Sequence, residues 1–532
     1  MSNNFYENLK NAQANTSVTE KGMQGYKHTN HALTDFNFGI ASYRSNTVKA
    51  SQDFERVLKE KEEYVLKYLF YLRDAREGIG ERDLFRACIR QLLFSNVADK
   101  DEIVSVILKQ TPEFGRWDDL WLFLDTKYAS QVIALVRDTL KQDWANYKAG
   151  KSVSLLAKWL PSANASSKET KRLANLVISA LGTTPRNYRK VLSTLRAYID
   201  VTEVKTCAKE WGNIDYNKVP SKANLKYKEA FLKHDEARRR EFLSKALAGD
   251  KTVKVHMGVS FPHEIVHKYG YANRGYDQSL EAYWKNLKPC VGLKDTIVVR
   301  DGSGSMTCTI GGTEISALDI STALAIYCSQ YLEGGFKDKF ITFDNNAQMV
   351  DLSSCGSLQS KLRTTYRYTA CGTTNVEDVF RLILTTAVHS HMKPEEMPST
   401  ILIISDMEFD PSAGTRIWYG CGMNAGANVF TEMDARFKQH GFKLPKLAFW
   451  NVNSRTQTIP CVYNENGVLL ISGFSQNVLS MVMNGKTDPY DAIIEELNKE
   501  RYAAIPLVKY GEAANLPKTK RTHEEETPDF LK

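Results

Sequence analysis

An apolar, β-branched run over 296–299 limits the possible folds of this chain more than any other segment, because it ends in Asp301-Gly302-Ser303-Gly304-Ser305. A short run of this composition predicts a buried strand. The two glycines allow a sharp turn, which leaves one carboxylate and two hydroxyls at the strand end. Open α/β sheets bind ligands at that end, and these oxygen ligands suit Mg²⁺ better than zinc.

The motif Asp301-x-Ser303-x-Ser305 resembles the metal-ion-dependent adhesion site of von Willebrand factor A domains. That family completes its site with a threonine from a later loop and an aspartate at the end of another strand. Both are present here, in a Cys-Gly-Thr-Thr loop before a helical pattern and at the end of the apolar run over 401–405. The resemblance implies one Mg²⁺ surrounded by five side chains, which are Asp301, Ser303, Ser305, Thr373 and Asp406. The alternative is a Gly/Ser turn without metal.

The hydrophobic pattern divides the chain into four segments. Residues 1–45 are polar, and we expect an arm that is partly extended and docks through its aromatic residues. Residues 46–290 carry apolar residues at spacings of three and four, which predicts an all-α, HEAT-like solenoid. Residues 291–510 alternate strand and helix patterns, which predicts a doubly wound α/β domain of the von Willebrand factor A type with a mostly parallel sheet. Residues 511–532 are charged and predict a flexible tail.

A helical repeat domain followed by an A domain with a metal site is the layout of the TROVE-domain family, which includes the Ro ribonucleoprotein autoantigen. Residues 261–269 are similar to a Pro-x-His-aliphatic segment of that family, and Cys371-Gly372-Thr373 is similar to its Gly-Gly-Thr. The first half is also similar, around 71–74, 80–86 and 211–221, to a related family without assigned function. The resemblance implies an RNA-binding protein whose RNAs are small and non-coding or misfolded, with single-stranded ends, and whose metal site docks a protein partner.

Positive charge is concentrated in the first part of the chain. Residues 1–300 contain 49 Lys and Arg against 35 Asp and Glu, whereas residues 301–532 contain 21 against 27. A basic surface attracts polyanions. Residues 151–200 hold nine Lys and Arg against two acids, and the cations that we expect to contact RNA are Lys168, Lys171, Arg172, Arg186, Arg189, Lys190 and Arg196. Tyr188 and Trp159 are candidates to stack on bases.

Ordinary solvated charge on helix surfaces is the alternative explanation for these cations. It is the stronger explanation for a second basic cluster within 222–240, because acids interleave with the cations there. If it also holds for 151–200, the protein belongs to a different functional class, a metal-dependent scaffold for protein partners that binds no nucleic acid.

The segment His263-Glu264-Ile265-Val266-His267 matches the HExxH pattern of zinc metalloproteases, which is the less favoured third reading. The longer form of the pattern needs a third histidine near position 273, where Asn273 stands. We therefore expect no zinc, and a short helix that packs between the two domains. The chain also lacks a GxxxxGK[ST] loop and a GxSxG elbow, so we expect no enzymatic activity.

The compartment is predicted from cysteine usage and from the absence of targeting signals. The nine cysteines form no CxxC pair and are odd in number, which favours reduced thiols in the cytoplasm. No segment resembles a signal peptide or an apolar membrane span.

Overall fold

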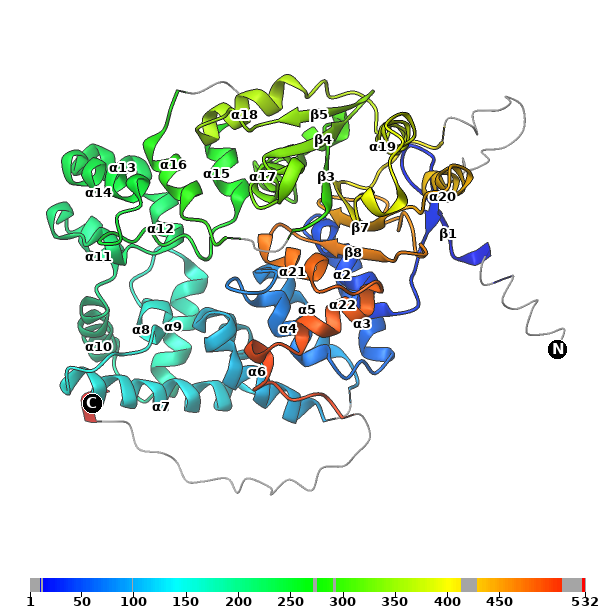
Figure 1. Cartoon of the computed structure of the whole chain (residues 1–532). Coiled ribbons are helices and arrows are strands. Elements are labelled where there is room, and N and C mark those ends of the chain that lie inside the picture. The colour runs from blue at the N-terminus through cyan, green and yellow to red at the C-terminus, as the bar shows by residue number, and fades with distance from the viewer. Residues whose placement is uncertain are drawn as a thin grey trace. The chain divides into compact units, whose positions relative to one another are not determined.

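The computed structural model describes residues 10, 13–97, 99–270, 275–289, 293–412, 428–509 and 529–531. The chain divides into two compact units. Figure 1 shows its helices and strands coloured along the sequence. Unit 1 comprises Met1–Glu62, Arg76–Ile79 and Arg240–Arg501, and unit 2 comprises Glu63–Ala75, Gly80–Arg239 and Tyr502–Lys532. The predicted combination of a helical part with an α/β part is confirmed. The boundaries differ from the predicted ones, because residues 46–62 and 240–289 belong to the unit that contains the sheet.

Unit 1 is built on a six-stranded sheet with the order β5-β4-β3-β6-β7-β8. Its strands are β3 (Thr296–Asp301), β4 (Lys339–Phe343), β5 (Ala347–Asp351), β6 (Thr400–Ser405), β7 (Lys446–Asn451) and β8 (Val468–Ser472). Neighbouring strands run parallel except at the edge, where β5 is antiparallel to β4. The mostly parallel sheet is therefore confirmed, and its central strands are continuous apolar runs because both faces are covered.

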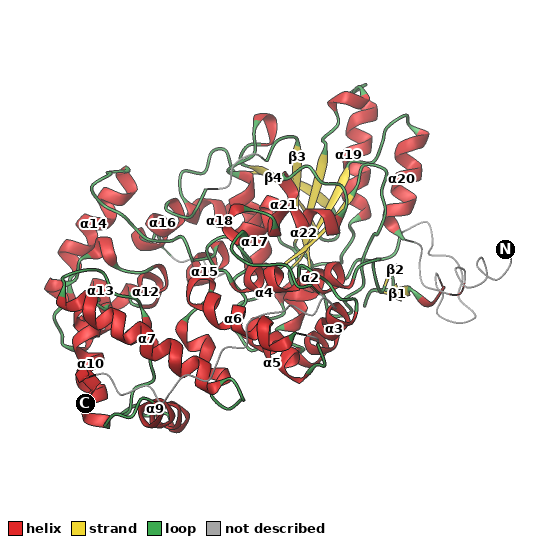
Figure 2. Ribbon diagram, turned by 90° about the horizontal axis from the view of Figure 1, so that it is seen from below, coloured by secondary structure: helices red, strands yellow, loops and turns green. Residues whose placement is uncertain are grey.

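Helices cover both faces of this sheet, with α19 (Glu377–His389) and α20 (Val429–Gln439) on one side and α17 (Ala317–Ser329) on the other (Figure 2). The first face holds the main core, in which the Phe430 ring lies 5.7 Å from Phe380 and 4.9 Å from Phe449. Further helices of unit 1 are α3 (Thr47–Lys59), α15 (Pro262–Tyr269), α16 (Gln278–Lys285), α18 (Leu358–Arg367), α21 (Leu479–Met483) and α22 (Pro489–Leu497).

The first 45 residues are not simply the extended arm that we predicted. β1 (Thr16–Val18) and β2 (Gln24–Tyr26) form an antiparallel hairpin, but α2 (Ala32–Tyr43) is a helix that packs on β8. Eleven of its twelve residues are buried. A helix that is buried on nearly all sides has no amphipathic period, so the hydrophobic pattern gave no helical signal. The prediction of an arm is wrong for residues 32–43.

Unit 2 is helical. Its helices are α4 (Val65–Arg73), α5 (Arg82–Phe94), α6 (Lys100–Phe114), α7 (Ala129–Lys148), α8 (Leu156–Trp159), α9 (Lys168–Ala180), α10 (Pro185–Tyr198), α11 (Thr202–Cys207), α12 (Ser221–Lys226) and α13 (Lys228–His234). The boundary between the units falls inside α14 (Glu236–Ala248). Tyr502 returns to this unit late in the chain, where its ring stacks on Phe114 at 5.6 Å.

Most of the predicted flexible tail, residues 511–528 and Lys532, lies outside the described residues. Asp529–Leu531 are described and form a short 3₁₀-helix. Among the helices that the structure describes, none has the length and apolar character that crossing a membrane requires.

The burial of α2 predicts that this helix is an integral part of unit 1. Phe36 is fully buried and its ring lies 5.5 Å from Phe54, so Phe36→Ala should lower the free energy of unfolding by about 3–5 kcal/mol. Val48 is 68% exposed, and the control Val48→Ala should change the free energy of unfolding by less than about 0.5 kcal/mol. Chemical denaturation measures both, and equal small effects would contradict the packing described.

Candidate metal centre and nucleic-acid interface

The two predicted aspartates lie at the carboxyl ends of neighbouring strands. The register pairs Arg300 of β3 with Ile404 of β6, so Asp301 ends one strand and Asp406 follows the other. Both side chains are fully buried. The Ser405 hydroxyl donates a hydrogen bond to Asp301 Oδ2 at 2.5 Å. Two carboxylates are thus held in the interior at one edge of the sheet.

The turn after β3 brings both predicted serines to these carboxylates. The Ser303 backbone N–H donates to Asp301 Oδ1 at 2.9 Å, and the Ser303 and Ser305 hydroxyl oxygens lie 3.1 Å apart. Ser305 also hydrogen-bonds the side chain of Asp406. Four of the five predicted ligands therefore form one connected cluster.

The fifth predicted ligand, Thr373, belongs to a loop that touches this turn. The Gly304 N–H donates to the Gly372 carbonyl at 3.0 Å, and a Cβ at Gly304 would lie 2.8 Å from the Cys371 carbonyl oxygen, so only glycine fits there. Thr373 is exposed. The next residue, Thr374, is fully buried, and its hydroxyl has no hydrogen-bond partner among the described residues. The loop thus offers two threonine hydroxyls, of which the buried one was not predicted.

The buried carboxylates repel one another. Burial and, to a lesser extent, the charge of Asp406 raise the pKa of Asp301 to about 7, against the hydrogen bonds from Ser405 and Ser303. Burial also raises the pKa of Asp406, whereas the guanidinium of Arg455 and the hydrogen bond from Ser305 lower it. A cation in contact with both carboxylates would relieve this repulsion.

Arg455 is a site residue that the sequence did not indicate. It follows β7, and its Nη1 lies 3.1 Å from Asp406 Oδ2. Its backbone N–H donates to Glu408 Oε1 at 2.8 Å, and its Nε donates to Glu20 Oε2 at 2.6 Å. No local motif marks this arginine, because its partners lie far away in the sequence.

Arg300 is the other buried cation beside the site. Its guanidinium is fully buried and donates to three hydroxyls, those of Thr322, Thr342 and Thr369, at 3.0–3.1 Å. Four buried carboxylates surround these two arginines, and they are Asp301, Asp344, Asp406 and Glu408. The acids outnumber the cations by two, so a divalent cation fits the local charge.

The donor set also fits Mg²⁺ better than zinc. The part of the chain that the structure describes contains no group of three or more His, Cys, Asp or Glu side chains arranged to hold a metal. The candidate centre instead offers two carboxylates and several hydroxyls, and a magnesium ion completes such a set with water.

The two histidines of the HExxH pattern have other contacts. The His263 ring is buried between Phe261 and Phe474, at 5.7 and 5.8 Å between ring centroids. His267 Nδ1 lies 3.0 Å from Asp319 on α17. The helix α15 packs on α17 inside unit 1, whereas we predicted a helix between the domains. The absence of zinc stays a prediction.

The predicted RNA contacts lie on α9 and α10 in unit 2. Five cations are exposed and have no ion pair within the described residues, and they are Lys168, Lys171, Arg186, Arg189 and Lys190. Residues three or four apart share one face of a helix, so the first two lie together on α9 and the other three lie together on α10. We call these five residues the α9–α10 cations.

Two of the predicted cations are already engaged. Arg172 donates to both carboxylate oxygens of Asp125 at 2.7–2.8 Å and also pairs with Glu169, which raises its pKa. Arg196 is partly buried and donates to the carbonyls of Ala157 and Leu160 at 2.8 and 2.9 Å. Arg196 therefore holds the 157–162 segment in place.

The structure treats the two predicted stacking residues differently, because only one of them is fully buried. Tyr188 is fully buried, and its hydroxyl donates to the Pro161 carbonyl at 3.0 Å. It shares the apolar face of α10 with Val191, Leu192 and Leu195, so packing explains its position. The guanidinium of Arg116 lies 4.0 Å above the Trp159 ring. The stacking assignment is wrong for Tyr188, and Arg116 covers one face of Trp159.

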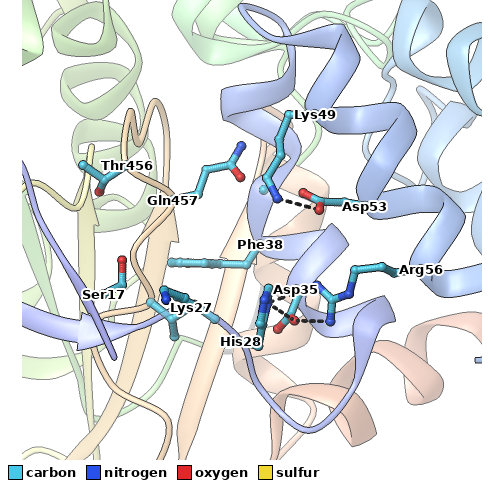
Figure 3. A pocket seen from close by; sticks show the side chains of 12 residues that line it. Ser17, Lys27, His28, Asp35, Phe38, Lys49, Asp53, Arg56, Thr456 and Gln457 are labelled. Atoms are coloured by element: carbon cyan, nitrogen blue, oxygen red, sulfur yellow. Dashed lines mark hydrogen bonds and ion pairs between the residues drawn. The ribbon is translucent and has the colours of Figure 1, made fainter. Parts of the chain in front are cut away.

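A separate cavity of about 190 Å³ lies in unit 1 between the β1–β2 hairpin, α2, α3 and the 456–459 segment (Figure 3). Its charged groups pair with one another except Lys27, which donates to the Ala14 carbonyl at 2.8 Å. Asp35 lies 3.2 Å from both His28 and Arg56, and Lys49 lies 2.7 Å from Asp53. None of the predicted site residues lines it.

Two family models match parts of this chain. Residues 295–526 match a domain of unknown function (DUF7788), and residues 125–288 match another domain of unknown function (DUF2828). Each model covers less than half of the chain. The second includes 211–221, one of the segments on which we based the similarity to a family without assigned function.

Two proteins similar to this chain are described next, and neither similarity shows a function for the chain. The uncharacterized protein L728 of Acanthamoeba polyphaga mimivirus is 27% identical over 547 residues, which cover 94% of this chain and 90% of the viral protein. The crystal structure of the Deinococcus radiodurans Ro (RSR) protein aligns with 86% of this chain and 94% of its own, at 13% identity and a TM-score of 0.38. At that TM-score a shared fold does not follow.

The raised pKa of Asp301 predicts how stability changes with pH when metal is removed. Because the folded-state pKa is raised from 3.8 to about 7, this carboxyl stabilises the fold at low pH and loses that contribution as pH rises through about 7. In chelator, the free energy of unfolding of the wild type should therefore fall relative to that of Asp301→Asn between about pH 4 and 7, by up to about 1.4 kcal/mol per pH unit, and level off at higher pH. Denaturation at several pH values measures this difference, and parallel curves would contradict the assignment.

Proposed function

We propose that this protein binds RNA through the α9–α10 cations and carries Mg²⁺ at the sheet edge of unit 1. The observation that carries the proposal is the set of five exposed cations without an ion pair in the described structure. An exposed lysine or arginine that no neighbouring acid holds is able to contact a phosphate oxygen, so these five cations are available to RNA.

The acids of the same region are occupied elsewhere. Residues 151–200 contain two of them, Glu169 and Asp200. Glu169 pairs with Arg172 at 2.8 Å, and Asp200 pairs with Lys205 at 2.6 Å. The positive potential of α9 and α10 is therefore not cancelled locally. The resemblance of the motifs to the TROVE-domain family favours RNA over other polyanions.

In this proposal the magnesium ion is held by Asp301, Ser303, Ser305 and Asp406, with a hydroxyl from Thr373 or Thr374. When bound, the ion would offer a position to one carboxylate or phosphate oxygen of a partner. Arg455 would set how strongly the ion binds, because its charge already offsets that of Asp406 at 3.1 Å. No catalytic step is part of the proposal.

RNA affinity should depend on the α10 cations. Changing Arg186, Arg189 and Lys190 together to Glu should lower the affinity for single-stranded RNA by at least about tenfold. It should also reduce the slope of log K against log salt by about 0.7 for each lost contact. Filter binding over a salt series measures both quantities.

The matched control reverses three exposed lysines that already pair with acids, Lys59, Lys127 and Lys443. The net charge changes equally in both variants, so the control should bind RNA nearly as the wild type does. Equal loss in both would mean that net charge alone attracts RNA. No loss in either would favour the scaffold that binds no nucleic acid.

Magnesium binding should respond in opposite directions to two substitutions. Asp301→Ala should abolish it, whereas Arg455→Met should strengthen it by about tenfold, because the competing cation beside Asp406 is removed. Titration calorimetry with MgCl₂ measures both. The control Glu20→Gln weakens the other contact of Arg455 and leaves Asp406 untouched. Unchanged binding in Asp301→Ala would refute the site.

A further inference from the structure

A short segment far along the chain docks on unit 2. Phe530 stacks on the Trp144 ring of α7, with 5.1 Å between centroids and 13° between planes. Leu531 is fully buried, and its carbonyl accepts a hydrogen bond from the hydroxyl of Thr183. Two apolar side chains and one main-chain contact thus fix a segment of only three described residues.

The surface that receives this segment is aromatic. Trp144 lies 5.5 Å from Tyr147, which in turn meets the edge of Tyr198 on α10 at 5.1 Å. The ammonium of Lys148 lies 5.7 Å from the Trp144 ring. Aromatic rings with a cation at their rim are suited to an acidic peptide that carries an aromatic residue.

The docking point is close to the proposed RNA contacts. Thr183 stands two residues before Pro185, the first residue of α10, and the segment contacts this helix. Arg186, Arg189 and Lys190 occupy the first two turns of the same helix. Docking of Phe530 and Leu531 therefore brings this segment beside the cations that would bind phosphate.

Acidic residues stand next to the docked pair in the sequence. Asp529 is part of the docked segment, and Glu524, Glu525 and Glu526 precede it by three to five residues. Carboxylates and phosphates bind the same guanidinium and ammonium groups. A docked segment of this composition is therefore a candidate competitor of RNA.

We propose that the surface formed by α7 and the start of α10 is a peptide-binding site, which the chain's own Phe530-Leu531 segment occupies reversibly, and that this segment competes with RNA for the α10 cations. The competition rests on the proposed RNA binding, whereas the peptide site does not. Tethering keeps the local concentration of the segment in the millimolar range, so a weak contact suffices.

RNA binding by the full chain tests the competition. The double variant Phe530→Ala/Leu531→Ala should bind single-stranded RNA about 5- to 20-fold more tightly than the wild type, a normal range for coupling between two sites. Changing Glu524, Glu525 and Glu526 to Gln should also raise the affinity, although the docking pair remains. If the wild type and the double variant bind RNA with equal affinity, the competition is refuted while the proposed RNA binding stands.

A labelled peptide tests the site independently of RNA. A fluorescein-labelled peptide of residues 521–532 should bind the double variant saturably, as measured by anisotropy, and the same peptide with Ala at 530 and 531 should not. Trp144→Ala and Thr183→Val, each introduced into the double variant, should each weaken this binding. If no protein binds RNA, saturable peptide binding still supports the site, and its absence overturns it.

Discussion

Two carboxylates that are buried at adjacent strand ends govern the organisation of unit 1. Asp301 and Asp406 are brought together by the parallel register of β3 and β6, and neither reaches water. Buried charges are tolerated only with partners, so the surrounding chain supplies them. The serine turn donates hydrogen bonds, and Arg455 supplies a guanidinium. The four buried carboxylates around Arg300 and Arg455 nevertheless exceed these two cations by two. A divalent cation is the simplest completion of this centre.

The sheet was predictable because its central strands are continuous apolar runs and helices alternate with them. The order of Asp301, Ser303, Ser305 and Asp406 along the chain also placed these residues correctly at one edge, because parallel strands align their carboxyl ends. The helix α2 was not predictable in the same way. Its apolar residues have no helical period, since the fold buries it on nearly every side.

Long-range partners account for most of what the sequence did not reveal. Arg455 reaches Asp406 from the loop after β7, and an isolated arginine in a polar loop has no distinguishing pattern. The docking of Phe530 on Trp144 was hidden by the charged composition around it. The burial of Tyr188 was predictable from the sequence, however, because its spacing to Val191, Leu192 and Leu195 is that of an apolar helix face.

The central proposal concerns unit 2, in which α9 and α10 would present cations to RNA phosphates. Ultraviolet crosslinking of the full chain to RNA, followed by mass spectrometry of the crosslinked peptides, tests this claim most directly. The account predicts that crosslinked peptides map to residues 165–200 and disappear when Arg186, Arg189 and Lys190 are changed to Glu. Crosslinks that map only to unit 1, or none above the level of a protein that does not bind RNA, would contradict it.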